Sequence, residues 1–392
     1  MRIAFVSPFY GARAAGGAES ECRRTAIHLA RRGIDVEILT TCLLDLNHDW
    51  NVNYYKDGDY REDGLTVRRF RAEAIDKDAF AMLDSRIKNC EKLSHEEELQ
   101  HAALFINSFG LYRYLDKEQD AYDFFCFIPY LFGSTYFGAR VCPSKSILIP
   151  CLHDEPYARM RTAAETFERA SKIVFHTESE MGLARKLYEV NERQALLIGE
   201  GVDTNIDSNP ERFRREYKID GRFLLYAGRK DQSKNTPLLL DLFAAFSRRG
   251  GTDMKLVLIG PGALEIPASL SDSILDLGYI PLQDKYDAYA AAEALCQPSL
   301  NESFSLVMME SWLCGTPCIV NAGCATTREH VVKSGGGLFF DGYADFEGVL
   351  NFMRKHGDQW QAMGQAGREY VLENYTWEHI IDKYLSRVLC RQ

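Results

Sequence analysis

Two carboxylates stand eight residues apart in the stretch QPSLNESFSLVMMESWLCGTPCIV, which begins at Gln297. Glu302 lies in a polar turn, and Glu310 lies in the helix expected to follow, for which Ser303 is the predicted N-cap. A Gly-Thr-Pro sequence ends that helix. Carboxylates beside the exposed N–H groups of a helix start are typical of a site for an anionic ligand that also carries hydroxyls. A solvated helix surface is the alternative for each Glu considered singly.

A pair of cations follows another apolar run, Phe223–Ala227. Arg229 and Lys234 stand in one loop at the end of this predicted strand, and a guanidinium together with an ammonium suits a diphosphate. Either residue alone is most simply a surface charge. Glu310 can accept two hydrogen bonds from a ribose diol. The group therefore predicts a nucleotide-diphosphate site, with the backbone around Tyr279–Pro281 bordering the base.

A glycine loop near the N-terminus is a further candidate for phosphate contact. The predicted strand Arg2–Ser7 is followed by a loop that closes on Gly16 and Gly17, and then by a predicted helix, Ala18–Arg32. Glycines before a helix let backbone N–H groups approach a phosphate. The GxGxxG fingerprint is absent, so a nicotinamide enzyme is not favoured. A plain tight turn explains most Gly-Gly pairs.

His153 follows the predicted strand Ser146–Leu152. Ligands of open α/β sheets collect at the carboxyl ends of strands, so this is a functional position, although a core histidine explains it equally well.

The Asp57-Gly58-Asp59 sequence matches a metal-binding DxD pattern, but its polar neighbours favour a turn. The eleven cysteines contain no CxxC pair, and several of them, such as Cys126, Cys151 and Cys318, lie in apolar runs and are interpreted as buried free thiols. No metal site is expected.

The elements that position these residues form two runs of alternating strands and helices. Such alternation predicts an α/β protein with two doubly wound parallel-sheet domains, at 1–201 and 202–375, and a final helix in 376–392. Between Leu44 and Gln119 the pattern is least regular. A helical stretch is expected there around Phe80–Leu115. Its packing stripe is predicted to be Phe105, Phe109, Tyr112 and Leu115.

Composition narrows the class of protein. With 392 residues the chain is long enough for two domains, and a net charge of −10 argues against a nucleic-acid binder. The sequence has no apolar run long enough to span a bilayer, and its N-terminus does not resemble a signal peptide. The free cysteines favour a reducing cytoplasm. Short arginine clusters allow at most peripheral contact with an anionic membrane at its inner face.

The motifs in combination resemble the retaining GT-B glycosyltransferases of family 4, the glycosyl transferases group 1, over nearly the whole chain. Glu302 and Glu310 match the E-x7-E motif of that family. One departure is Asn235, which follows Lys234 where many members have Gly. The other matching sequences are Gly16-Gly17-Ala18-Glu19, Gly228-Arg229, Pro298, Ser303-Phe304 and Gly315-Thr316-Pro317.

The resemblance implies two Rossmann-like domains facing a cleft, with a final helix that crosses back to the first domain. It implies that Arg229 and Lys234 bind the donor pyrophosphate, that Glu310 holds the ribose, and that His153 approaches the reacting end of the sugar. Glu302 would contact the donor sugar. The donor-binding set expected on these grounds is Gly16, Gly17, Arg229, Lys234, Gly260, Tyr279, Ile280, Glu302, Phe304, Ser305, Leu306 and Glu310, with Glu302, His153, Arg229 and Lys234 as the catalytic group.

The activity implied is transfer of a hexose from a nucleotide-diphosphate sugar, UDP- or GDP-linked, to a hydroxyl with retention of configuration. No cofactor or metal is expected, since the two cations serve the leaving diphosphate. A glycan, lipid-linked or small-molecule acceptor and a role in polysaccharide biosynthesis follow from the family. Two alternatives remain open, namely a nucleotide-sugar epimerase of similar architecture and a non-catalytic nucleotide-sugar-binding subunit. The sequence does not determine the sugar, base, acceptor or oligomeric state.

Overall fold

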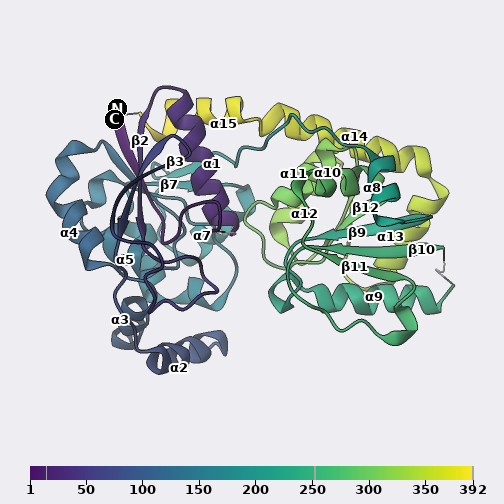
Figure 1. Ribbon diagram of the computed structural model, residues 1–392, viewed down its shortest axis with the longest axis horizontal. Coiled ribbons are helices and arrows are strands. Elements are labelled where there is room, and N and C mark those ends of the chain that lie inside the picture. The colour runs from purple at the N-terminus through teal and green to yellow at the C-terminus, as the bar shows by residue number, and fades with distance from the viewer. Residues whose placement is uncertain (15, 251–252, 391–392) are drawn as a thin grey trace. The chain divides into compact units, whose positions relative to one another are not determined.

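The computed structural model describes residues 1–14, 16–250 and 253–390, and the chain forms two compact units (Figure 1). One unit combines Met1–Gly201 with Glu378–Gln392, and the other is Val202–Trp377. The first boundary coincides with the one expected from the Gly- and Asp-rich sequence after residue 200. The second lies two residues beyond the expected position.

The first unit is built on an eight-stranded sheet in the order β3-β4-β2-β1-β5-β6-β7-β8. All neighbouring strands are parallel except β3 and β4, which are antiparallel. The strands are β1 (Arg2–Val6), β2 (Asp35–Thr41), β3 (Gly58–Glu62), β4 (Leu65–Phe70), β5 (Phe124–Phe127), β6 (Ser146–Leu148), β7 (Lys172–Phe175) and β8 (Ala195–Leu197). The main helices are α1 (Gly17–Arg31), α2 (Lys77–Lys88), α3 (His95–Leu104), α4 (Phe109–Glu118), α5 (Gly133–Gly138), α6 (Arg161–Arg169), α7 (Glu178–Leu187) and α15 (Trp377–Lys383), which continues as a π-helical turn (Tyr384–Val388).

The second unit has six parallel strands in the order β11-β10-β9-β12-β13-β14. Chain order reverses between β9 and β12, which makes this pair the topological switch point of the sheet. The strands are β9 (Arg222–Ala227), β10 (Met254–Ile259), β11 (Ile274–Gly278), β12 (Ala294–Gln297), β13 (Cys318–Asn321) and β14 (Gly337–Phe340). The main helices are α8 (Pro210–Tyr217), α9 (Thr236–Arg248), α10 (Leu282–Ala291), α11 (Leu306–Leu313), α12 (Ala325–Ser334), α13 (Tyr343–Lys355) and α14 (Gly357–Asn374).

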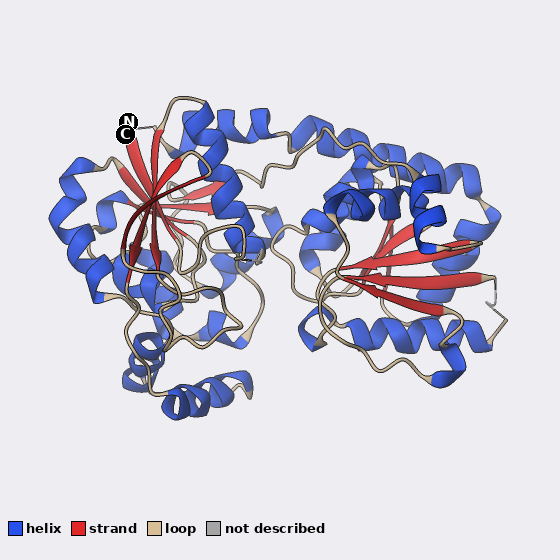
Figure 2. Ribbon diagram, viewed as in Figure 1, coloured by secondary structure: helices blue, strands red, loops and turns tan. Residues whose placement is uncertain are grey.

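Both faces of this second sheet are buried, as a parallel sheet requires. Alternate residues of β9 enter different cores: Phe223 and Leu225 pack with α10 and α11, whereas Leu224 and Tyr226 pack with α9 and α13. Figure 2 shows the strands of this unit with helices on either side. The near-continuous apolar strands of the sequence therefore reflect burial on two faces, and the predicted α/β class is confirmed.

The least regular part of the sequence contains a hairpin that sequence analysis did not predict. Gly58 and Asp59 begin β3, so the predicted turn at 57–59 was wrong. The reversal instead lies at Asp63-Gly64, where both residues have positive φ (55° and 79°), the conformation of a two-residue hairpin turn. The Asp59 carboxylate forms an ion pair with Arg68 at 2.7 Å.

The single helical stretch expected around Phe80–Leu115 is in fact divided among three helices. Asp76, Ser94 and Ser108 accept hydrogen bonds from the first-turn N–H groups of α2, α3 and α4 and so start each helix anew. Phe109 is the first residue of α4, and its side chain is 57% exposed, so it does not belong to the predicted stripe, whereas Leu115 is buried.

Candidate functional site

The start of α11 lies two residues later than predicted. Ser303 is not the N-cap; Ser305 holds that position in a left-handed conformation (φ 73°, ψ 70°), and its side chain caps no backbone N–H. The Ser305 hydroxyl is buried and has no hydrogen-bond partner among the described residues. A helix start without a side-chain cap leaves N–H groups for a ligand, and anions bind in such places.

Lys234 and Glu302 meet beside this helix start. The Lys234 ammonium lies 2.7 Å from a Glu302 carboxylate oxygen, which also accepts a hydrogen bond from Gln297 at 3.3 Å. Lys234 ends the short 3₁₀ turn after β9, and Glu302 follows β12, so the pair spans the topological switch point. Both side chains are mostly buried, with exposed fractions of 24% and 10%. The pair is thus a charged element at the place where open α/β sheets bind ligands.

The loop that carries Lys234 is shaped by its own side chains. Asp231 accepts hydrogen bonds from the Lys234 N–H at 3.0 Å and from the Ser233 hydroxyl at 2.6 Å. Burial disfavours the charge on Asp231, but these hydrogen bonds outweigh it and lower the pKa of the carboxyl. Asn235, the departure from the family pattern, has φ 55° and donates to the Pro298 carbonyl at 3.1 Å. Asn is among the residues that tolerate this left-handed conformation, so the loop keeps its course without glycine.

Two further basic residues of this loop have different surroundings. The Arg229 side chain is 53% exposed and lies 3.4 Å from the Ser233 hydroxyl and 3.7 Å from Asp231. Lys230 is buried and forms an ion pair with Asp276 of β11. Lys230 therefore ties the ends of two strands together, whereas Arg229 is accessible to a ligand.

Glu310 projects from α11 toward α10. Its carboxylate lies 2.8 Å from the Lys285 ammonium and accepts a hydrogen bond from the Tyr289 hydroxyl at 3.0 Å. Burial and the adjacent Glu310 charge raise the pKa of Tyr289 well above its ordinary value, so this phenol stays a donor. The Glu310 side chain is 13% exposed. Two donors on one helix thus hold the carboxylate in a defined orientation.

Of the remaining predicted contacts of the second unit, Gly260, Tyr279 and Ile280 lie around the ends of β10 and β11, and Phe304 lies just before α11. Gly260 follows β10 with φ 121°, Tyr279 follows β11 and is 84% exposed, and Ile280 is buried. Phe304 is also buried and packs edge-on against His330 and Tyr375. Phe304 and Ile280 therefore support the site from within the core.

Gly260 is required for the close approach of two loops. A Cβ atom at this position would lie 2.1 Å from the Gly228 carbonyl oxygen, and its φ is one that other residues rarely adopt. We expect Gly260→Ala to lower the free energy of unfolding by at least about 2 kcal/mol, measured by urea denaturation. Gly342→Ala is the matched control, because its Cβ would meet no atom within 4 Å. Equal stability of the two variants would contradict the steric argument.

Gly16, Gly17 and His153 belong to the first unit. Gly16 is the N-cap of α1 and Gly17 its first residue, so the predicted glycine loop does end at a helix start. His153 follows β6, with its Nδ1 atom 4.0 Å from a Glu155 carboxylate oxygen and 29% of its side chain exposed. The predicted strand Ser146–Leu152 was too long, because β6 ends at Leu148, and His153 lies in the loop beyond it rather than directly at the strand end.

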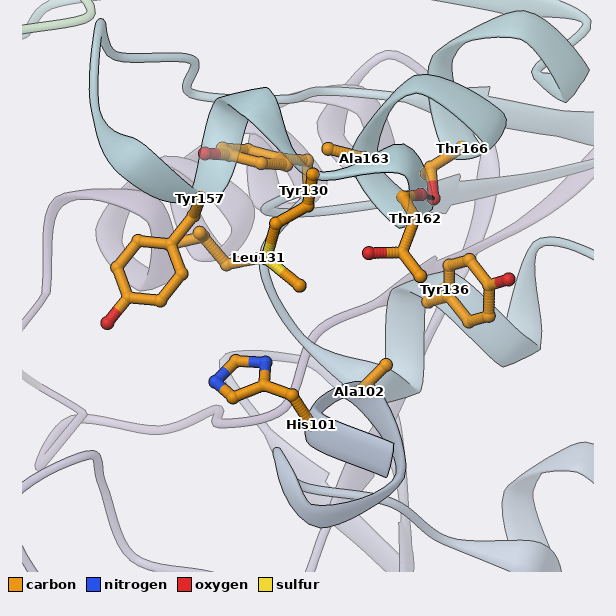
Figure 3. A pocket seen from close by; sticks show the side chains of 10 residues that line it. His101, Ala102, Tyr130, Leu131, Tyr136, Tyr157, Thr162, Ala163 and Thr166 are labelled. Carbon is orange, nitrogen blue, oxygen red and sulfur yellow. Dashed lines mark hydrogen bonds between the residues drawn. The ribbon is translucent and has the colours of Figure 1, made fainter. Parts of the chain in front are cut away.

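A small cavity in the first unit has a volume of about 20 Å³ (Figure 3). Ten residues line it, among them His101, Tyr130, Tyr157 and Thr162. Such a volume holds about one water molecule, so this cavity is no substrate site.

Part of the second unit is similar in sequence to a known protein family. Residues 208–370 match the family model for glycosyl transferases group 1. The matched segment lies within the second unit and covers less than half of the chain. The matched segment contains both residues of the Lys234–Glu302 pair, the uncapped start of α11 and Glu310.

Curated relatives of this chain include two D-inositol 3-phosphate glycosyltransferases. The protein of Gordonia bronchialis is 26% identical over 253 residues, which cover 59% of this chain and 55% of the relative. That of Saccharomonospora viridis is 32% identical over 190 residues, covering 42% and 43%. The chain thus spans about half the length of the curated relatives it matches.

Solved structures resemble the chain over nearly its full length. The sucrose-phosphate synthase of Thermosynechococcus elongatus has a TM-score of 0.73 at 19% identity, covering 99% of this chain and 98% of that one. Anabaena Alr3699/HepE in complex with UDP and glucose has a TM-score of 0.72 at 14% identity, covering 98% of each chain. The expected GT-B fold, two Rossmann-like domains in one chain, is confirmed.

Lys285, the partner of Glu310 within the matched segment, was not among the residues predicted from the sequence. Lys285 and Tyr289 are four residues apart on α10 and therefore share a face of that helix. This spacing alone does not show which other helix or strand Lys285 and Tyr289 contact. None of the described helices is long and apolar enough to cross a bilayer.

Proposed function

We propose that the protein is a retaining, metal-independent glycosyltransferase that moves a hexose from a UDP- or GDP-sugar to a hydroxyl of a glycan, lipid-linked or small-molecule acceptor. The observation that carries this proposal is the Lys234–Glu302 pair beside the uncapped start of α11, at the switch point of the second unit's sheet. The Lys234 ammonium and the first N–H groups of α11 can bind a diphosphate, and the Glu302 carboxylate can accept a hydrogen bond from a sugar hydroxyl.

Each part of the donor has a partner in this arrangement. The pyrophosphate is bound by Lys234, Arg229, the first N–H groups of α11 and the buried Ser305 hydroxyl. The ribose diol donates hydrogen bonds to Glu310, and the exposed Tyr279 ring lies beside the base. Positive charge and N–H dipoles already in place stabilise the diphosphate as it leaves, so no divalent metal is needed for that step. Gly16 and Gly17, at the start of α1, are proposed to offer further backbone N–H groups to a phosphate.

Similar proteins support the same class of donor. Alr3699/HepE is described in complexes with UDP and with UDP-glucose, and the curated relatives are named glycosyltransferases. These names belong to those proteins, and for this chain they favour UDP-glucose as the first donor to test.

The proposal is tested by thermal unfolding with UDP, GDP, TDP and ADP and their sugars, with and without Mg²⁺. A ligand present at 100 times its dissociation constant should stabilise the protein by about 2.7 kcal/mol. We expect one base to stabilise most, equally well without Mg²⁺. No stabilisation by any nucleotide, or a strict need for Mg²⁺, would contradict the proposal. With the best donor, turnover in the absence of acceptor would indicate an epimerase, and binding without turnover a non-catalytic subunit.

His153 is proposed to act on the donor sugar from the first unit. We expect His153→Ala to lower kcat about 10²-fold, by loss of a group that interacts with the reacting sugar, while the affinity for the nucleoside diphosphate is unchanged. Steady-state kinetics and nucleotide titration measure the two effects separately. His48→Ala is the control, because that imidazole is exposed and bonded only to the neighbouring Asp45 among its described contacts. Full activity of His153→Ala would make the histidine structural.

A further inference from the structure

A buried polar cluster in the first unit lies outside the donor site. Glu21 comes from α1, Cys151 from the segment after β6, His176 from the residue after β7, and Glu180 from α7. Glu21, His176 and Glu180 are each no more than 3% exposed, whereas Cys151 is half-buried. The cluster is therefore part of the interior of this unit, at the carboxyl ends of two parallel strands.

Three potential ligand atoms of the cluster converge on one point. One carboxylate oxygen of Glu21, the Sγ atom of Cys151 and a ring nitrogen of His176 all lie within 4.8 Å of one another. Glu21 lies 2.6 Å from His176 Nε2 through one oxygen and 3.5 Å from Cys151 Sγ through the other. Bonds from Zn²⁺ to sulfur, nitrogen and oxygen of about 2.3, 2.0 and 2.1 Å place tetrahedral ligand atoms roughly 3–4 Å apart. The observed separations fit such a site with small side-chain shifts.

Glu180 orients the imidazole from its other side. A Glu180 carboxylate oxygen lies 3.1 Å from His176 Nδ1, which directs Nε2 toward Glu21. The same carboxylate is itself held by the backbone N–H groups of His176 and Leu152, each at 2.7 Å. A carboxylate bonded to the far nitrogen of a ligating histidine is a recurrent feature of zinc sites.

We propose that Glu21, Cys151 and His176 bind one Zn²⁺, with Glu180 as the positioning residue for the imidazole. One carboxylate oxygen, one thiolate sulfur and one neutral imidazole nitrogen form the ligand set. This mixed set suits zinc, whereas Mg²⁺ and Ca²⁺ prefer oxygen ligands alone. On binding, Cys151 loses its thiol proton and a protonated His176 loses the Nε2 proton, so one dication replaces two protons. The net charge of the buried cluster therefore stays the same, and binding adds no uncompensated buried charge.

The test is zinc binding by the full chain, which does not depend on the proposed glycosyltransferase activity. Chelator-treated protein is titrated with Zn²⁺ in competition with a chromophoric chelator, and bound metal is counted by mass spectrometry. We expect one Zn²⁺ per chain, no specific binding by Cys151→Ser, and an affinity about 10–100-fold lower for Glu180→Gln. Cys90→Ser should bind as the unchanged protein does, because Cys90 is exposed and remote in sequence from the cluster.

A second readout distinguishes ligation from a loss of folding. Co²⁺ in place of Zn²⁺ should produce a thiolate-to-cobalt charge-transfer band in the unchanged protein and in Glu180→Gln, and no such band in Cys151→Ser. Zinc should also raise the melting temperature of the unchanged protein. The proposal is overturned if less than one equivalent of Zn²⁺ binds, or if Cys151→Ser binds Zn²⁺ as tightly as Cys90→Ser.

Discussion

Replacing Lys234 with alanine should lower kcat/KM about 10²–10³-fold, the loss expected when one group that stabilises the developing charge, worth roughly 3 kcal/mol, is removed. An ammonium has three donors, so Lys234 can keep its bond to Glu302 at 2.7 Å while it donates to a phosphate oxygen. Steady-state kinetics with the best donor of the thermal screen measure the effect. Arg229→Ala should act in the same direction but less strongly, because this side chain is 53% exposed and its charge is better screened by water.

Lys355→Ala provides the matched control for Lys234→Ala. Lys355 is the exposed last residue of α13, and its charge lies outside the proposed site. We expect its activity to equal that of the unchanged protein. A Lys234→Ala protein that folds, as judged by its melting curve, and retains near-normal kcat/KM would refute the phosphate role.

Replacing Glu310 with alanine should weaken nucleoside diphosphate binding about 10–100-fold, since hydrogen bonds to a charged group contribute about 1.5–3 kcal/mol. The carboxylate is held by Lys285 and Tyr289, so it meets a ribose diol in a fixed orientation with little loss of side-chain entropy. Isothermal titration with the nucleoside diphosphate gives the affinity directly. Lys285→Ala should cost less, because Glu310 and the hydrogen bond from Tyr289 remain.

A deoxyribose ligand tests whether the ribose is what Glu310 recognises. The unchanged protein should bind the 2′-deoxynucleoside diphosphate more weakly than the ribonucleotide, and Glu310→Ala should bind the two alike. Glu369→Ala on the exposed face of α14 should preserve the discrimination. If Glu310→Ala still discriminates between the two sugars, another group recognises the ribose.

The sequence determined the class of fold because its signal is local. Apolar runs such as Phe223–Ala227 alternate with helical patterns, and in a parallel sheet every functional loop then follows a strand at its carboxyl end. Arg229 and Lys234 follow β9 and Glu302 follows β12, as that rule predicts, whereas His153 lies further along the loop because β6 ends at Leu148. Their roles in catalysis stay predictions.

Local sequence patterns did not predict the exact start of an element where more than one residue fits the pattern. Ser303 and Ser305 are both suitable N-caps by type, and the left-handed backbone of Ser305 became apparent only in the folded chain. The hairpin of β3 and β4 was missed because its short, charged first strand has no apolar alternation, although Asp63-Gly64 marked the turn. The division of 77–118 into three helices was indicated by Asp76, Ser94 and Ser108, whose capping role competes with a single longer helix.

Tertiary structure alone decided which charges meet. Lys234 and Glu302 are 68 residues apart, and they pair because β12 adds to the sheet beside β9 rather than beside β11, the strand before it in the chain. Lys285 faces Glu310 because α10 packs on α11, and His176 reaches Glu21 across 155 residues. Strand order and helix packing follow from burial summed over the whole core, which no single stretch of sequence contains.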